Sequence, residues 1–81
     1  MKIGDRITTR TGYIGVITDT FPDLAVAIRR GFVDADWYGQ LRIPPLSTPQ
    51  DRWFHVVLDD GGAILVGEID ILIVIEEVSR G

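Results

Sequence analysis

His55 is the only histidine in the chain and the residue type best suited to acid–base chemistry, because histidine ordinarily changes charge near neutral pH. The nearest acidic residues along the chain are Asp59 and Asp60. Four residues of extended strand span about 13 Å, so Asp59 cannot reach His55 from the same strand. A catalytic partner would have to come from another strand. The pattern favours a histidine on the less buried face of a hairpin.

Pairs of acidic residues could hold a metal ion or share a catalytic proton, as could Asp34 and Asp36, Asp59 and Asp60, or Glu76 and Glu77. Neighbouring residues in a strand point to opposite faces, which separates Glu76 from Glu77. Asp59 and Asp60 are typical turn residues. Asp34 and Asp36 could share a face, but two carboxylates are too few for a calcium loop. The sequence predicts no metal site and no cofactor.

The sequence also lacks the motifs of a catalytic nucleophile and of a phosphate-binding loop. The chain has no cysteine, which excludes thiolate catalysis and cysteine-based zinc sites. Ser47 and Ser79 lack the flanking glycines of a nucleophile elbow. Gly12 and Gly15 are not followed by the lysine and helix of a phosphate-binding loop. We therefore predict no catalytic residue, and an enzyme is the less favoured interpretation.

Large aromatic side chains bracket the middle of the chain, at Trp37, Tyr38, Trp53 and Phe54. Tryptophan and tyrosine are common at recognition surfaces because they supply a large contact area at a low entropy cost. The alternative is local packing, and we expect at least one of Trp53 and Phe54 to be in the core. The candidate ligand-binding residues are Trp37, Tyr38, Trp53 and His55.

Short runs of Val, Ile, Thr and aromatic residues, separated by Gly, Pro and Asp, predict strands over 5–9, 15–20, 24–30, 53–58, 63–66 and 71–76. In 24–30 the strand interpretation turns Leu24, Val26 and Ile28 inward. Helix is the alternative there, because the segment holds two alanines and two arginines. Asp60-Gly61 suits a two-residue hairpin turn, in which both residues need a positive φ.

Residues 31–52 show no sustained period. The adjacent prolines Pro44 and Pro45, followed by Pro49, forbid a helix and a long central strand. We interpret this segment as a long insertion, with a short strand near residues 40–43. A loop of that length in a small domain is typically functional or disordered.

The length, charge and apolar content of the chain bear on its domain number and on which kinds of partner it binds. A chain of 81 residues predicts a single domain over 1–81. The net charge of −4 and the scattered arginines weigh against nucleic-acid binding. The N-terminus resembles no signal peptide, and the longest apolar stretch, 69–75, is too short to span a bilayer. These features predict a cytoplasmic protein with no membrane partner, which the absence of cysteine fits.

Residues 71–75 are apolar without alternation, which predicts burial on both faces. One small barrel has a single interior, so either the 31–52 insertion or another subunit must cover the outer face. We expect a homo-oligomer. Its candidate interface residues are Ile64, Val66, Ile71, Ile73 and Ile75.

Two blocks of sequence resemble a known fold. Residues 3–7, Ile-Gly-Asp-Arg-Ile, followed by Gly12 and Gly15-Val16-Ile17, resemble the opening of SH3-like and KOW-type barrels. The closing block, from Trp53 through Asp60-Gly61 to Ile75, resembles the hairpin, short helical turn and last strand of the same barrels. The resemblance implies an all-β, SH3-like small barrel of about five strands, with residues 31–52 inserted before the closing hairpin. Such barrels host many unrelated functions.

The order of these segments in the chain resembles that of the type II, plasmid-borne dihydrofolate reductases. Their catalytic Val-Gln-Ile-Tyr stretch falls nearest residues 66–69, Val-Gly-Glu-Ile, where the glutamine and tyrosine are missing. The insertion also has no counterpart in that family. The resemblance therefore implies the barrel, an oligomer and a history on mobile bacterial DNA, but not reductase activity.

Three functional hypotheses remain open. The leading one is an oligomeric module that binds a protein segment or a small ligand near the insertion. The second is an enzyme whose active site forms between subunits, which predicts a shared cavity lined by His55, Tyr38 or carboxylates. The third is a KOW-like nucleic-acid reader, which predicts that arginines converge on one face: Arg6, Arg10, Arg29 and Arg42.

Overall fold

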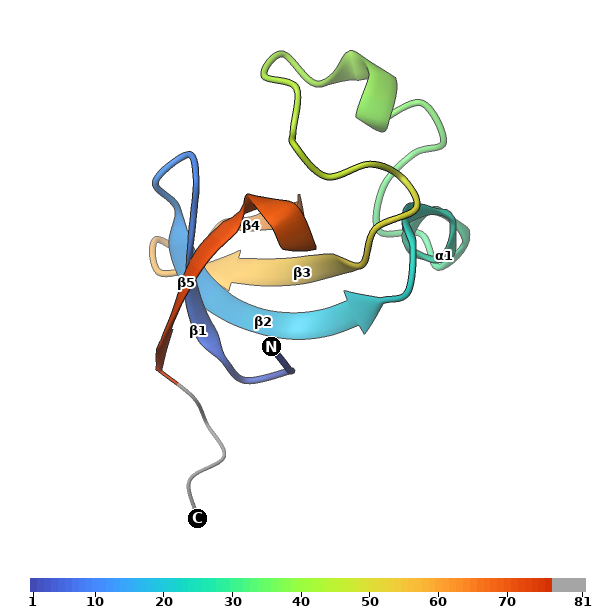
Figure 1. Cartoon of the computed structure of the whole chain (residues 1–81). Helices are drawn as coiled ribbons and strands as arrows, with labels where there is room; N and C mark the ends of the chain where they lie inside the picture. The colour runs from blue at the N-terminus through green and yellow to red at the C-terminus, as the bar shows by residue number, and fades with distance from the viewer. Residues whose placement is uncertain (77–81) are drawn as a thin grey trace.

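The framework of the protein is a five-stranded antiparallel sheet, seen in a computed structural model that describes residues 1–76 (Figure 1). Its strands are β1 (Arg6–Thr9), β2 (Ile14–Phe21), β3 (Trp53–Leu58), β4 (Ala63–Gly67) and β5 (Ile71–Glu76). Their order across the sheet is β4-β3-β2-β1-β5. The predicted all-β class is confirmed. The sheet is open, because β4 and β5 are its two edges and do not pair with each other.

Two hydrophobic clusters lie on the two sides of β3, because neighbouring strand residues point to opposite faces. Phe54, Val56 and Leu58 join the first cluster, together with Ile7, Ile17 and Val66. Trp53, one residue out of phase, joins the second cluster with Phe21, Leu24 and Ala27. The alternation in β3 therefore places Phe54 in the first cluster and Trp53 in the second, and both side chains are buried.

Residues 24–30 were predicted as a strand, and that prediction is wrong. They form the helix α1 (Leu24–Arg29), which was the alternative. The Asp23 side chain caps the helix by accepting a hydrogen bond of 3.1 Å from the Val26 N–H. Leu24 and Ala27, three residues apart, are buried on one helix face. The helix ends before Gly31, whose φ of 85° suits a helix C-terminus.

The hairpin between β3 and β4 has a longer turn than the predicted two-residue turn at Asp60-Gly61. Only Gly61 has a positive φ, of 97°, and Asp60 does not. The Leu58 N–H donates to the Gly62 carbonyl, and the Gly61 N–H donates to the Leu58 carbonyl. This pattern is typical of a three-residue loop that ends in a glycine bulge.

Strand β5 contains two irregularities that explain its unbroken apolar run. Its register against β1 shifts twice, leaving Leu72 and Ile75 as extra residues between paired positions. Such β-bulges rotate the side chains that follow them. Ile71 and Val74 consequently pack on the first cluster, whereas Leu72, Ile73 and Ile75 are exposed. Within the chain, the run is therefore not buried on both faces.

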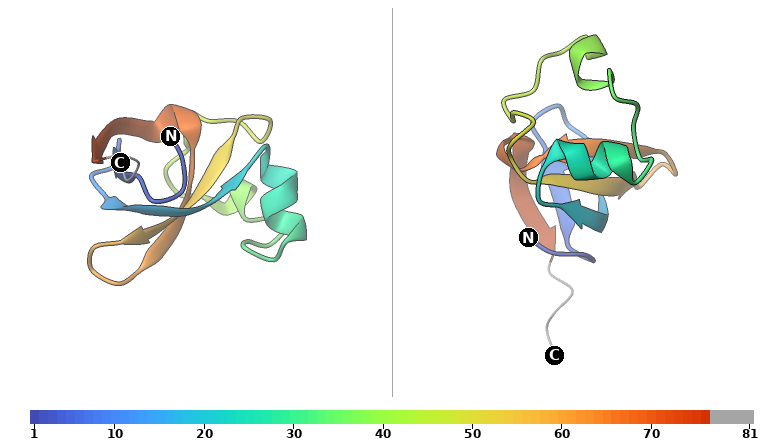
Figure 2. Two further views of the ribbon diagram at one scale, coloured as in Figure 1. Left: turned by 90° about the horizontal axis from the view of Figure 1, so that it is seen from below. Right: turned by 90° about the vertical axis from the view of Figure 1, so that its right-hand side faces the viewer.

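The 31–52 segment stands above the sheet, on the side away from the N-terminus (Figure 2). It contains the 3-10 helix η1 (Tyr38–Gln40) and no strand at 40–43, where one was predicted. The Tyr38 hydroxyl donates to the Ser47 carbonyl at 2.9 Å, and the Trp53 ring N–H donates to the Thr48 carbonyl at 3.0 Å. A second 3-10 helix, η2 (Glu68–Asp70), joins β4 to β5. Glu77 and Ser79, considered above, lie outside the described residues.

Candidate functional site

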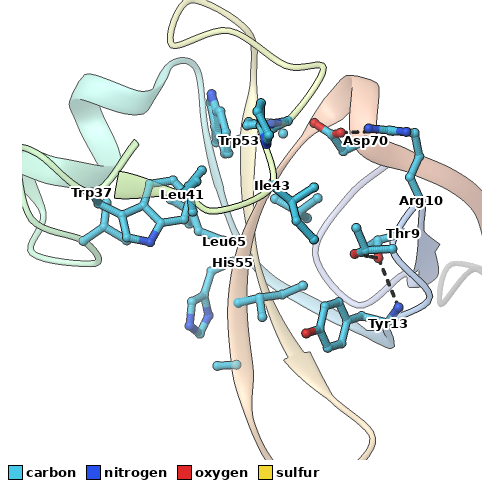
Figure 3. Close-up of a pocket in the computed structure, with 18 of the residues that line it drawn as sticks. Thr9, Arg10, Tyr13, Trp37, Leu41, Ile43, Trp53, His55, Leu65 and Asp70 are labelled. Atoms are coloured by element: carbon cyan, nitrogen blue, oxygen red, sulfur yellow. Dashed lines mark hydrogen bonds and ion pairs between the residues drawn. The ribbon is translucent and has the colours of Figure 1, made fainter. Parts of the chain in front are cut away.

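A groove of about 690 Å³ opens between the 31–52 segment, strand β4 and the loop that joins β1 to β2 (Figure 3). One wall carries Trp37, Leu41 and Ile43 from the 31–52 segment. The opposite wall carries Thr9 from the end of β1, and Arg10 and Tyr13 from the β1–β2 connection. Trp53, His55 and Leu65 line it from β3 and β4. This volume lies within the range of small-molecule and cofactor sites.

Three of the four predicted ligand-binding residues, Trp37, Trp53 and His55, line the groove. Tyr38 does not line it. The Trp37 and Tyr38 rings pack edge-on against Trp53, with centroids 5.7 and 6.0 Å away. Trp53 is almost completely buried and mainly supports the other two rings.

Sequence reasoning missed several groove residues, notably Tyr13, Leu41, Ile43 and Leu65. Single aliphatic residues in an irregular segment carry no periodic signal, so Leu41 and Ile43 could not be assigned to a surface. Ile43 is 68% exposed although it is strongly apolar. That exposure is informative only because the structure places Ile43 at the groove.

The His55 ring is held by a residue of the neighbouring strand β2. Its Nδ1 lies 2.6 Å from the Thr18 hydroxyl oxygen, and the same hydroxyl lies 3.3 Å from the His55 carbonyl oxygen. Both bonds form together when Nδ1–H donates to Thr18 and the hydroxyl donates to the carbonyl. This arrangement leaves Nε2 as the hydrogen-bond acceptor of the ring.

Acidic residues do not complete a catalytic pair with His55. Asp59 is bound to Arg6 at the hairpin loop. Asp19, the cross-strand neighbour on β2, lies 4.0 Å from Nδ1 and also pairs with Arg30. The hydroxyl of Ser47 is buried and accepts a hydrogen bond from the Ile69 N–H at 3.0 Å. These contacts are those of a structural serine and a positioned histidine.

Asp70 fastens the 31–52 segment to the sheet. Its carboxylate accepts hydrogen bonds from the backbone N–H groups of Leu46 and Ser47, both at 3.0 Å, and from Arg10 Nε at 3.2 Å. Burial by itself raises the pKa of Asp70, but the hydrogen bonds from Leu46, Ser47 and Arg10 outweigh it and leave the pKa below its ordinary value of 3.8. The groove wall therefore depends on a residue far away in the sequence.

The lowered pKa of Asp70 predicts a pH dependence of stability. Its carboxylate is more acidic in the folded chain than in the unfolded chain, so its contribution is fully present above pH 3.8. That contribution is lost as the pH falls through the lower, folded value. We expect the free energy of unfolding, measured by urea titration, to fall below pH 3.8 in the unaltered protein. The part of this fall that comes from Asp70 should be absent in Asp70→Asn. The same loss of stability below pH 3.8 in Asp70→Asn as in the unaltered protein would contradict this role.

The positive charges of the groove come from Arg10 and Arg42. Arg10 is paired with Asp70, whereas Arg42 makes no ion pair with any residue of the described part, 1–76. Arg6, on β1, and Arg29, on α1, do not line the groove. The four arginines that a nucleic-acid reader would bring to one face are thus divided between separate places.

The five candidate interface residues are similarly divided. Val66 is buried, and Ile64 and Ile71 are partly buried against the first cluster. Ile73 and Ile75 are exposed, at 60% and 43%. The 31–52 segment leaves Leu72, Ile73 and Ile75 open to solvent.

Among residues 1–76, no group of three or more His, Cys, Asp or Glu side chains is placed to hold a metal ion. The same residues include no helix of the length and apolar character needed to cross a membrane. Comparison with protein families, with curated proteins and with solved structures finds no match to this chain. The site therefore has to be interpreted from its own geometry.

Proposed function

We propose that this protein is a non-enzymatic binding module that takes an apolar group of a protein segment or small ligand into the groove. The observation that carries this proposal is the groove of about 690 Å³, which has walls from three separate parts of the chain. Ligand sites typically combine apolar walls with a few polar groups that orient the ligand. Here the apolar walls are Trp37, Leu41 and Leu65, and the polar groups are His55 and Arg42.

Exposed apolar side chains at the groove favour binding over catalysis. Ile43 and Tyr13 face the same hollow from opposite walls and are 68% and 47% exposed. A ligand between them would remove this surface from water, which is favourable by about 25 cal/mol per Å² of apolar area. Catalysis would need a nucleophile or an acid hydrogen-bonded to His55, but Nδ1 is bonded to Thr18, and Asp19 lies 4.0 Å away and pairs with Arg30.

A titration with small aromatic fragments such as indole tests this function. We expect fragments to shift the NMR amide signals of Trp37, His55 and Leu65. Ile43→Ala should weaken fragment binding about fivefold, because it removes roughly 1 kcal/mol of apolar contact at an exposed position that the fold does not need. Ile3→Ala, which truncates another exposed isoleucine (57% exposed) outside the groove and outside β5, is the matched control. Equal affinities for the two variants would refute the groove as the binding site.

The proposed fold is SH3-like. What supports it is the closing half of the chain, where the β3–β4 hairpin, the 3-10 turn η2 and a last strand that returns to β1 follow in the implied order. The 31–52 segment lies between α1 and the hairpin. In this proposal, the segment and helix α1 are additions to a small barrel left open between β4 and β5.

Self-association through β5 is part of the same proposal. Leu72 and Ile73 are each 60% exposed, on neighbouring positions of an edge strand, and exposed apolar patches are typical of interaction sites. We expect light scattering to give a mass above the 9.0 kDa of one chain. Ile73→Lys should return the mass to that of one chain without lowering the free energy of unfolding of the monomer. If light scattering gives the mass of a single chain for the unaltered protein, self-association through β5 is refuted.

A further inference from the structure

The outer edge of β4 runs along the groove. Strand β4 pairs only with β3 and is one end of the sheet. All of its residues, Ala63–Gly67, line the groove. An edge strand carries backbone N–H and C=O groups that can pair with another extended chain. The groove therefore contains backbone hydrogen-bonding groups as well as apolar walls.

The hydrogen bonds at the two ends of β4 show which of its peptide groups face the open edge. Leu58 N–H donates to the Gly62 carbonyl at one end, and Glu68 N–H donates to the Arg52 carbonyl at the other. In an antiparallel pair, residues alternate between bonding to the partner strand and facing away from it. Even-numbered residues of β4 thus bond to β3, and Ala63 and Leu65 face outward. Their N–H and C=O groups have no hydrogen-bond partner among residues 1–76.

Neighbouring segments limit this open edge. At Gly67, an added Cβ would collide with Cβ and Oγ of Ser47, so the 31–52 segment covers the strand there. The hairpin loop ends the edge on the other side, at Gly62. The available length is the stretch from Ala63 to Leu65. It can form up to four hydrogen bonds, because two outward residues each have one donor and one acceptor.

The charge at the groove indicates what the ligand carries. Arg42 has no acidic partner among the described residues, and the only groove carboxylate, Asp70, is already bound to Arg10, Leu46 and Ser47. The groove is therefore positive within a chain whose net charge is −4. A ligand with a carboxylate would complement Arg42, because guanidinium and carboxylate groups form strong paired hydrogen bonds.

We infer that the groove binds an extended peptide segment, which adds to β4 through Ala63 and Leu65 and turns an acidic group toward Arg42. This inference rests on the proposed function and names its ligand class. Main-chain hydrogen bonds supply affinity in such strand addition, and alternate side chains enter pockets. One of those side chains would lie against Trp37, Leu41 and Leu65. A free peptide suits this site, because side chains of the 31–52 segment and of the β1–β2 connection stand on either side of β4 (Figure 3) and Arg42 complements an acidic group on the peptide.

Selection from a displayed library of random seven-residue peptides tests the inference. We expect the selected peptides to alternate apolar and polar residues, to contain Asp or Glu, and to lack proline at every second position. A synthetic copy of one selected peptide should slow amide hydrogen exchange at Ala63 and Leu65 at least tenfold. Methylating its backbone nitrogens one at a time should weaken binding at least tenfold at alternate positions and little between them.

Arg42 is tested with the same synthetic peptide. Arg42→Ala should weaken binding of the acidic peptide about tenfold and leave the version with Asn or Gln in place of the acid nearly unchanged. Arg29→Ala is the matched control, because Arg29 is an exposed arginine on α1 outside the groove. Equal losses for the two peptides would overturn the role given to Arg42.

The outcomes separate this inference from the proposed function. Peptides that bind in the groove without protecting Ala63 and Leu65, or without a two-residue period in the methylation series, overturn strand addition and leave the binding module standing. If small fragments bind in the groove but no peptide is selected, strand addition is also overturned and the binding module is retained. Concentration-dependent protection of Ala63 and Leu65 in the free protein would mean that a second copy occupies the edge, and it would also overturn the inference. Failure of both fragments and peptides would overturn both proposals.

Discussion

Replacing Gly15 with alanine is expected to lower the free energy of unfolding by about 3 kcal/mol, the upper end of the usual cost of overpacking. Gly15 lies in β2 directly opposite Leu58 of β3. An added Cβ would collide with the Val57 carbonyl oxygen and lie 2.9 Å from the Leu58 Cα. Rotating the Val56 side chain, whose Cγ1 is 2.8 Å away, could relieve one contact, but the other two atoms belong to the backbone and cannot be moved by side-chain rotation. The two central strands would have to separate locally.

Gly39→Ala is the control for this substitution. Gly39 lies in η1, and a Cβ there meets no atom within 4 Å. Its φ is not positive, so alanine fits without backbone strain. Urea denaturation should leave this variant as stable as the unaltered protein or slightly more stable. Equal denaturation midpoints for the two variants would refute the close approach of β2 and β3 at Gly15.

Asp70→Asn is expected to have the second large effect, with a loss of about 3 kcal/mol in the free energy of unfolding. The asparagine amide nitrogen would face a hydrogen-bond donor, because Leu46, Ser47 and Arg10 all donate to this side chain. At least one donor would therefore lose its acceptor in a site that is mostly buried. Leaving a buried donor unpaired costs about 1–3 kcal/mol, and more when a charged group is involved.

The same substitution should loosen the groove wall. Amide hydrogen exchange at Leu46 and Ser47 should become faster in Asp70→Asn than the change in global stability requires, because these two N–H groups are bound to the Asp70 carboxylate. Arg10→Ala is the comparison variant. It removes only the partly exposed ion pair, for which about 1 kcal/mol is expected. Unchanged protection of Leu46 and Ser47 in Asp70→Asn would show that other contacts hold the segment.

Local patterns predicted the strands well, because a strand's two faces alternate whatever lies beyond it. The bounds of β3 and β5 agree with the predicted ranges, and β2 differs only at its ends. The same kind of reasoning was wrong for 24–30. Two alanines and a capping Asp23 were local signals for the helix, but the apolar residues Leu24, Val26 and Ile28 also fit a strand. Burial of Leu24 with Ala27 shows that the helical spacing prevails.

The site was only partly predictable. Aromatic residues bracketing an irregular segment pointed to Trp37 and Trp53, and His55 was singled out as the only histidine; all three line the groove. Asp70 was not identified, because its partners Leu46 and Ser47 lie 24 and 23 residues away in the sequence and nothing local marks it as their acceptor. The hairpin turn and the bulges of β5 were missed for a related reason. Strand register depends on the partner strand as well as on the strand's own residues.

By itself, the amino-acid sequence determined the all-β class, the positions of five of the six predicted strands and the irregular nature of residues 31–52, since side-chain alternation and turn residues act over a few neighbouring positions. Only the tertiary structure decided that this segment, the β1–β2 connection and the free edge of β4 enclose one groove. The physical reason is that a groove is made by contacts between distant residues. Those contacts depend on packing and strand order, which no local pattern encodes.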